Sequence, residues 1–231
     1  NILNLIKDFN NYKNEIKSEI VIAPTNIHIN LVKNNLRKDF KLSVQNIWHS
    51  EGANTGEISA DMVKDFEIDW TIIGHSERRH KISNEKNDLL FKKIESALNN
   101  NLNIIYCIGE LLDERNNNKT LDICFYQLEL LINNLKLNNW KNIVIAYEPV
   151  WAIGTGNTAT PEEAEYVHSN IRNHLFENIG DEAYNVRIIY GGSVKPNNCK
   201  ELIEKKNIDG FLVGGCSLKK DFLDIISIVD N

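Results

Sequence analysis

Residues 142–163 read NIVIAYEPVWAIGTGNTATPEE, and they contain one complete strand–loop–helix unit. The apolar, β-branched run Asn142–Tyr147 predicts a strand that is buried on both faces. Thr160 supplies an N-cap hydroxyl, Pro161 occupies the first helical position and Glu163 completes a capping box, so a helix should begin at Pro161. The strand and the helix are joined by a loop that starts at Glu148.

The same unit recurs along the chain, because short apolar runs alternate with segments of helical spacing. The other runs are Glu19–Ala23, Leu42–Gln45, Trp70–Ile73, Asn103–Cys107, Val186–Tyr190 and Gly210–Val213. One helical stripe is formed by Leu121, Phe125, Leu128, Leu131 and Leu135. This alternation, without a break in composition, predicts an α/β fold in which helices surround a parallel sheet: a (β/α)8 barrel that forms a single domain over residues 1–231.

The start of the chain departs from this order. An apolar stripe of Ile2, Ile6, Phe9, Tyr12 and Ile16 predicts an opening helix, where an alternating fold would open with a strand. The roughly seven predicted strands are one fewer than the eight that close such a barrel. A parallel sheet left open would expose two strand edges. We therefore expect the first strand to lie upstream of Asn1.

The charge and the residue composition argue against several classes of binding partner and of site. The formal net charge of −6 argues against nucleic acid and anionic membranes, which reward a basic surface. No apolar stretch approaches the roughly 18 residues of a membrane span. The cysteines lack the short spacings of zinc or redox sites, so we expect small buried side chains in a reducing compartment. They are Cys107, Cys124, Cys199 and Cys216.

Two ionisable side chains stand at predicted strand ends. His75 follows Ile73 and Gly74 and opens a helix-compatible run, where the helix dipole disfavours an added positive charge and keeps the imidazole neutral. Glu148 ends a wholly apolar strand, and partial desolvation there would raise its pKa toward the range of a general base. Taken singly, the two could instead be a histidine that satisfies local backbone groups and a solvent-facing rim glutamate.

The loops after the later strands suit a lid and a phosphate. Residues 149–156 (PVWAIGTG) join a stiff proline to a tip of small residues, which is typical of a lid that excludes water. Gly191, Gly192 and Ser193 follow one predicted strand, and Gly214 and Gly215 follow the last one. Glycine backbones approach an oxyanion closely and offer N–H donors, which suits a phosphate without any lysine. Each glycine pair taken alone would equally be a turn.

Four strings carry a resemblance to a known family. They are residues 73–79 (IGHSERR), 146–156 (AYEPVWAIGTG), 190–193 (YGGS) and 210–215 (GFLVGG). In identity and order they resemble triosephosphate isomerase, and the similarity runs from near Ala23 to the C-terminus. The resemblance implies a TIM-barrel enzyme of glycolysis and gluconeogenesis. Such an enzyme interconverts dihydroxyacetone phosphate and glyceraldehyde 3-phosphate through an enediol(ate), without a cofactor or a metal.

The resemblance also implies residue roles. It makes Glu148 the catalytic base, His75 the electrophile and Glu77 a buried glutamate that supports the site. Phosphate binding is implied for Gly154, Ser193, Gly214 and Gly215. The lid residues are Pro149, Val150, Trp151, Ala152, Ile153, Thr155 and Gly156, with Glu110 as the open-state partner of Trp151. The loop His49–Glu57, which includes Thr55, Gly56 and Glu57, is implied to reach the second subunit of a homodimer.

One departure keeps an alternative open. The family's first strand carries an Asn-x-Lys segment whose lysine contacts the substrate, and no such segment precedes the first predicted helix here. A catalytically inactive phosphate-binding paralogue or scaffold is therefore the alternative to an active isomerase. A different phosphate-binding barrel isomerase is the third hypothesis, since a fold alone does not determine function. We expect a cytoplasmic enzyme, or one of a plastid or another organelle if a targeting segment precedes Asn1.

Overall fold

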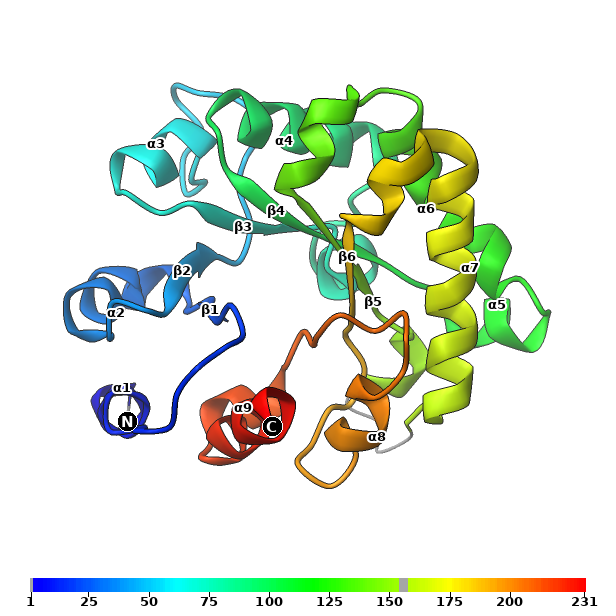
Figure 1. The fold of residues 1–231 in the computed structure, drawn as a ribbon. Coiled ribbons are helices and arrows are strands. Elements are labelled where there is room, and N and C mark those ends of the chain that lie inside the picture. The colour runs from blue at the N-terminus through cyan, green and yellow to red at the C-terminus, as the bar shows by residue number, and fades with distance from the viewer. Residues whose placement is uncertain (1, 154–157) are drawn as a thin grey trace.

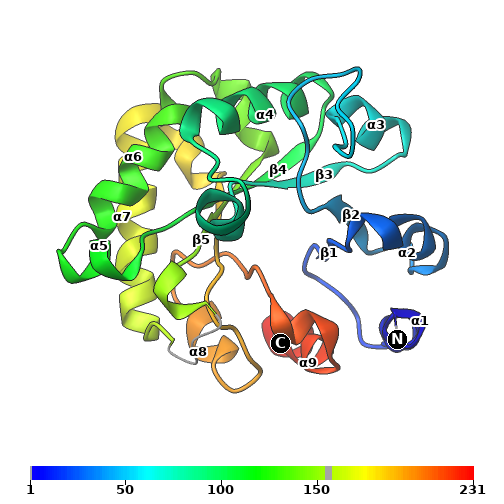
Figure 2. The same cartoon turned by 180° about the vertical axis from the view of Figure 1, so that it is seen from behind.

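Six parallel strands form one sheet in the computed structural model, which describes residues 2–153 and 158–231. Each strand is hydrogen-bonded to the next in chain order. They are β1 (Val21–Ile22), β2 (Lys41–Val44), β3 (Trp70–Ile73), β4 (Asn103–Ile108), β5 (Ile143–Tyr147) and β6 (Arg187–Tyr190). Figures 1 and 2 show the sheet curling into part of a barrel with helices on its outer side. The prediction of an α/β barrel with a parallel sheet is confirmed.

Helices follow the strands around the outside of the sheet (Figure 1). The α-helices are α1 (Ile2–Asn10), α2 (Ile29–Asn35), α3 (Ala60–Asp65), α4 (Asn87–Asn99), α5 (Leu112–Asn116), α6 (Thr120–Ile132), α7 (Pro161–Ile179), α8 (Cys199–Ile203) and α9 (Asp221–Asp230). A π-helix, η2 (Arg78–Ile82), follows β3, and two 3₁₀-helices, η4 (Val150–Ala152) and η6 (Gly215–Leu218), lie after β5 and near the C-terminus.

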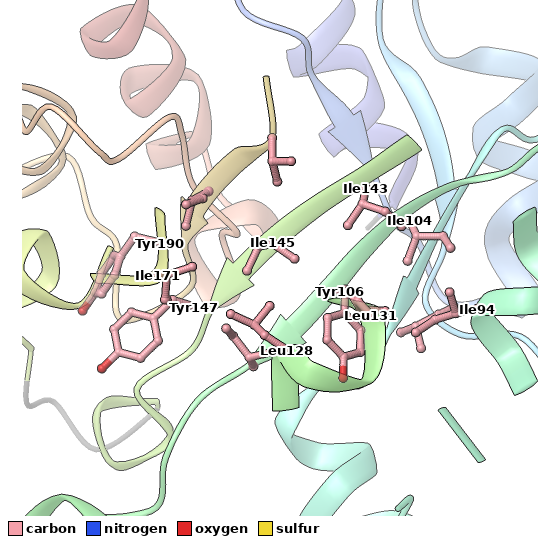
Figure 3. Close-up of a cluster of buried hydrophobic side chains, with 14 of the residues drawn as sticks. Ile94, Ile104, Tyr106, Leu128, Leu131, Ile143, Ile145, Tyr147, Ile171 and Tyr190 are labelled. Atoms are coloured by element: carbon pink, nitrogen blue, oxygen red, sulfur yellow. The ribbon is translucent and has the colours of Figure 1, made fainter. Parts of the chain in front are cut away.

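The central strands are buried on both faces, as their unbroken apolar runs predict. On the outer face, Ile104 and Tyr106 of β4 and Ile145 of β5 pack against helices α4, α6 and α7 (Figure 3). The alternate residues of the same strands point into the barrel, where Cys107 and Ala146 belong to a separate interior cluster. This period of two determines which side chains can reach the interior of the barrel.

The start of α7 lies where the capping box places it. The Thr160 hydroxyl accepts a hydrogen bond from the backbone N–H of Glu163 at 3.1 Å. The Glu163 carboxylate accepts one in return from the Thr160 N–H at 2.8 Å. Pro161 is the first helical residue, so the predicted helix start is confirmed.

The two outermost apolar runs form less strand than predicted. Only Val21–Ile22 of the run Glu19–Ala23 pairs, and it pairs with β2 alone. The run Gly210–Val213 makes a single parallel bridge, Phe211 to Tyr190, rather than a strand. Among the described residues, each run has a hydrogen-bonded neighbour on one side only. A strand at the edge of a sheet has no second neighbour to hold it, so its paired segment is shorter than that of a central strand.

The predicted opening helix is also shorter than its apolar stripe. Helix α1 ends at Asn10, whose side-chain amide donates to the Asn35 carbonyl and whose side-chain oxygen accepts from the Arg37 N–H. These side-chain bonds compete with continued helix formation. Tyr12 and Ile16, predicted on the helix, lie beyond its end but still pack on the same apolar cluster.

Helix α1 packs beside the C-terminal helix α9 (Figure 1). The rings of Phe9 and Phe222 lie 5.6 Å apart between their centroids. All four cysteines are free thiols, three of them buried and Cys216 partly exposed. Within residues 2–153 and 158–231, no helix is both long enough and apolar enough to span a membrane.

Candidate active site

The candidate residues gather at the C-terminal edge of the sheet. His75 follows β3, Glu110 follows β4, Glu148 follows β5, and Ser193 lies shortly after β6. Because all of these strands are parallel and adjacent, their C-terminal ends open onto the same side. The topology therefore brings together side chains that lie more than a hundred residues apart in the chain.

His75 and Glu148 are in direct contact. The Nε2 atom of His75 lies 3.1 Å from the Oε1 atom of Glu148. On the other side of the ring, Nδ1 accepts a hydrogen bond from the Glu77 backbone N–H at 3.3 Å. An accepting Nδ1 carries no proton, so the neutral tautomer has its hydrogen on Nε2 and donates it to Glu148. The ring is thereby oriented as a hydrogen-bond donor toward the site.

The Glu148 carboxylate is almost fully enclosed, with 2% of the residue exposed. Burial raises the pKa of Glu148. The neighbouring His75, the Ser76 N–H, which donates to Oε2 at 3.1 Å, and the Cys107 thiol act in the opposite direction and favour the ionised form. A desolvated carboxylate held by a few neutral donors is suited to general-base chemistry.

Glu110 organises the first residues of the loop that follows Glu148. It is fully buried and accepts hydrogen bonds from the Trp151 indole N–H at 2.9 Å and from the Tyr147 hydroxyl at 3.1 Å. Burial raises the pKa of Glu110, and the Trp151 hydrogen bond counteracts that effect. The Arg115 guanidinium stacks over the Trp151 ring at 4.1 Å. The expected Trp151–Glu110 contact is therefore present.

The rest of the lid residues are placed as follows. Pro149 is buried, and Val150–Ala152 form the short helix η4. The Ser193 hydroxyl donates to the carbonyl of Ala152 at 2.8 Å, so the loop after β6 holds the segment after β5. Ile153 is the last described residue before the gap. Gly154, Thr155 and Gly156 lie outside the described residues.

The predicted phosphate positions divide into two groups. Ser193 contacts the lid segment, and Gly191 lies next to the base, since a Cβ built on it would be 2.9 Å from Glu148 Cγ. Gly214 and Gly215 are exposed at the start of η6, and a Cβ on either would meet nothing within 4 Å. Open space above a glycine backbone leaves room for a ligand to approach its N–H groups.

Glu77 differs from the expectation. It was predicted to be buried, but its side chain is 53% exposed. It belongs to the first turn after His75, and its carboxylate lies 3.8 Å from His75 Nδ1 on the solvent side of the ring. The expectation of a buried glutamate is therefore wrong, since about half of the Glu77 side chain is exposed to solvent.

The loop His49–Glu57 leaves Thr55, Gly56 and Glu57 exposed. Gly52 and Gly56 adopt positive φ angles of 88° and 89°, which favour glycine over other residues. These turns extend the loop away from the sheet. Its tip is consequently accessible to another molecule.

Sequence reasoning missed three neighbours of the base. The Ser76 N–H donates to the Glu148 carboxylate, the Cys107 thiol lowers its pKa, and Gly191 packs against its side chain. Cys107 was interpreted only as a small buried side chain. The period-two pattern of the run Asn103–Cys107 could have placed its thiol inside the barrel, next to the end of the adjacent strand.

Comparison with known proteins agrees with this geometry. The family model described as triosephosphate isomerase matches residues 1–229. The chloroplastic triosephosphate isomerase of Secale cereale is 49% identical over 231 residues, covering 99% of this chain and 76% of the relative. The cytosolic triosephosphate isomerase of Gracilaria gracilis is 47% identical, covering 90% of this chain and 84% of the relative. The triosephosphate isomerase of Paracoccidioides lutzii is 45% identical, covering 98% and 91%. With a barrel, a carboxylate–imidazole pair and relatives matched over most of their length, the chain belongs to the triosephosphate isomerase family.

Proposed function

We propose that Glu148 and His75 carry out the proton transfers of this aldose–ketose isomerase. Glu148 removes a proton from C1 of dihydroxyacetone phosphate while the Nε2–H of His75 donates to the C2 carbonyl oxygen. The electron pair of the broken C–H bond forms the C1–C2 double bond of an enediol(ate). Return of the carbon proton to C2, with the proton of the O1 hydroxyl moving to O2 through Nε2 of His75, then gives glyceraldehyde 3-phosphate. The 3.1 Å contact between the two side chains is the observation that carries this assignment.

The same contact suggests how substrate activates the base. In this structure, Nε2 of His75 faces the Glu148 carboxylate. A substrate carbonyl that accepts this hydrogen bond takes a donor away from the carboxylate. Loss of a donor to the ionised form raises the basicity of a carboxylate. Substrate binding thus prepares the electrophile and the base in one exchange.

Glu148→Asp tests the assignment. The shorter side chain withdraws the carboxylate by roughly one methylene, so kcat should fall by two or more orders of magnitude (about 10²-fold per ångström of misplacement). Glu67→Asp is a matched control, because Glu67 is a glutamate of the same size exposed on a helix–strand connection and paired with Lys33. Wild-type turnover in Glu148→Asp, or equal losses in both variants, would remove Glu148 from the mechanism.

The phosphate group is proposed to bind the backbone of Gly154, Gly214 and Gly215 and to Ser193. Open space above Gly214 and Gly215 supports this, as does the start of η6, whose first N–H groups have no partner within the helix. Such amides attract an anion without a net positive surface. Glu77 is proposed to support His75 from the solvent side, since its carboxylate lies 3.8 Å from Nδ1.

Residues 149–156 are proposed to form a lid over the substrate. The Trp151–Glu110 and Ser193–Ala152 hydrogen bonds support this, because they hold the first part of the segment in one arrangement that closure would exchange for another. Deletion of residues 153–155 should let the enediolate expel phosphate and form methylglyoxal. An unchanged ratio of methylglyoxal to isomerised product would argue against the lid.

A homodimer is proposed as the working assembly, with the loop His49–Glu57 reaching the second subunit. The exposed loop tip supports this. Sedimentation equilibrium should give twice the chain mass, and deletion of Thr55–Glu57 should give the monomer. A monomeric unmodified enzyme at micromolar concentration would refute the proposal.

The compartment is proposed to be the cytoplasm, with a plastid as the alternative. The relatives include a cytosolic and a chloroplastic enzyme. A fluorescent fusion to the full coding sequence would decide between them by its co-localisation with a plastid stain. The inactive-scaffold alternative has no support in the described residues, where base and electrophile are in contact.

A further inference from the structure

Most buried charges of the described residues have an opposite charge beside them. The pairs are Glu85–Lys93 at 2.8 Å, Arg172–Asp209 at 2.6 Å and Glu110–Arg115 at 3.9 Å. Two buried side chains differ from this pattern, Arg79 and Glu148. Among the described residues, Arg79 has no carboxylate within 4 Å, and Glu148 has no lysine or arginine within that distance, only the His75 ring at 3.1 Å. A buried charge without compensation is costly, so both need an explanation.

The guanidinium of Arg79 donates four hydrogen bonds, all to neutral groups. It donates to the Gly74 carbonyl at 2.8 Å, to the Cys107 carbonyl and the Tyr106 hydroxyl at 3.0 Å each, and to the Asn87 side-chain oxygen at 3.1 Å. These bonds fix the position of the group and leave its positive charge unneutralised. In a region of low dielectric, that charge acts over a longer distance than it would in water.

Arg79 and Glu148 meet at the same residue. Arg79 donates to the carbonyl of Cys107, and the next residue of β4, Ile108, accepts a hydrogen bond from the Glu148 backbone N–H at 2.7 Å, so Cys107 lies beside Glu148. Arg79 also bonds to Gly74, the residue that precedes His75. The two opposite charges are therefore separated by one inward-facing residue of β4. The same guanidinium holds the turn that carries the electrophile.

We propose that Arg79 is a positioning residue of the isomerase, and that its buried guanidinium is the counter-charge that keeps Glu148 ionised while it holds the Gly74–His75 turn. This inference rests on the proposed role of Glu148 as the base. A direct Arg–carboxylate pair would occupy the carboxylate lone pairs and depress its basicity. A cation one residue away favours ionisation and leaves the lone pairs free for a proton.

The ionisable groups around the pair are consistent with this role. Burial raises the pKa of Glu148, and His75, the Ser76 N–H, Cys107 and then Arg79 oppose that effect. Burial likewise raises the pKa of the Cys107 thiol and of Tyr106, and Arg79 lowers both. The pKa of His80 is lowered by burial and by Arg79. Arg79 is thus the fixed cation that acts on every one of these groups, from β4, β5 and the turn after β3.

The test compares the pH dependence of kcat/KM in Arg79→Gln and Arg79→Lys. Removing the cation should raise the pKa of the acid limb by about one unit, so that Arg79→Gln loses activity mainly at low pH. Arg79→Lys keeps the positive charge but loses the planar guanidinium and its donors. The acid limb of its kcat/KM profile should therefore stay near the wild-type pH, even where its turnover falls. Equal acid limbs in all three enzymes, with only a uniform loss of rate, would overturn the proposal.

A second measurement covers the case in which Arg79→Gln does not fold. In the wild-type enzyme, the buried Nε–H of Arg79 should give an NMR signal, which is assigned by its absence in Arg79→Lys. The chemical shift of this signal should change with pH as Glu148 titrates. The shift should be lost in Glu148→Gln, and a signal without pH dependence in the wild type would refute the inference. If Glu148→Asp retains full turnover, the base assignment fails instead, so the two failures are distinguishable.

Discussion

Replacing Gly191 by alanine should displace the carboxylate of Glu148, the proposed base, while leaving the fold in place. A Cβ at this position would lie 2.9 Å from Glu148 Cγ and 3.3 Å from the Tyr147 carbonyl oxygen. Ordinary contact begins near 3.4 Å, so the glutamate side chain must move by about 0.5 Å. The carbonyl belongs to a central strand and cannot yield easily. The φ angle of Gly191 lies outside the left-handed region, so alanine introduces no backbone strain of that kind.

The displacement predicts the size of the kinetic effect. A misplacement of about 1 Å can cost roughly 100-fold in rate, so half of that distance should cost about tenfold in kcat, or about 1.4 kcal/mol of barrier. KM should change little, because the added methyl group faces Glu148 and not Gly214 and Gly215, the proposed phosphate-binding glycines. Steady-state kinetics in both reaction directions give kcat and KM, and a thermal melt followed by circular dichroism checks the fold.

Gly214→Ala is the matched control for Gly191→Ala. A Cβ there meets nothing within 4 Å, so the substitution moves no side chain of the protein. Its effect should fall on KM through the proposed phosphate contacts and spare kcat. Wild-type kcat in Gly191→Ala, or a loss confined to KM, would refute the reasoning that Gly191 exists to admit the base.

Three further predictions concern buried polar groups. Because burial raises the pKa of Glu148, the folded state binds the carboxyl proton more tightly than the unfolded state does, and the stability that this group contributes falls as pH rises through the folded pKa. Glu148→Gln should therefore be inactive, and at neutral pH it should unfold at a higher denaturant concentration than the wild type. In acid this difference in stability should vanish. Trp151→Phe removes the indole donor from the buried Glu110 and should lower the free energy of unfolding by about 2 kcal/mol in urea titrations, whereas an unchanged midpoint would mean that the bond is not formed in solution. Lys93→Met breaks a fully buried ion pair with Glu85 and should cost about 3 kcal/mol, measured in the same way, and a neutral result would show that the pair contributes no net stability.

The strand-end residues could be predicted from sequence because their signals are local. Glu148 and His75 each directly follow an apolar run, and parallel strands bring such positions to one side whatever the details of packing. The start of α7 at Pro161 was equally readable, because a capping box involves only four neighbouring residues.

Features that depend on distant neighbours were not predictable in this way. The run Gly210–Val213 has strand composition, but among the described residues it pairs on one side only, through the single bridge from Phe211 to Tyr190. The exposure of Glu77 and the contact of Cys107 with the base likewise depend on which elements cover each face. Arg79 reads as an ordinary surface arginine in sequence, and only the tertiary structure shows that it is buried.

The π-helix Arg78–Ile82 has a consequence for communication across the molecule. Its first two arginines point in different directions: Arg79 reaches the catalytic strand ends, whereas Arg78 bonds to Glu85, which also holds Lys93. Lys93 in turn donates to the Asn46 side chain, just before the loop toward the proposed second subunit. Through Glu85 and Lys93, one wide turn thus connects the Cys107 carbonyl at the end of β4 with Asn46, which lies shortly before the loop His49–Glu57.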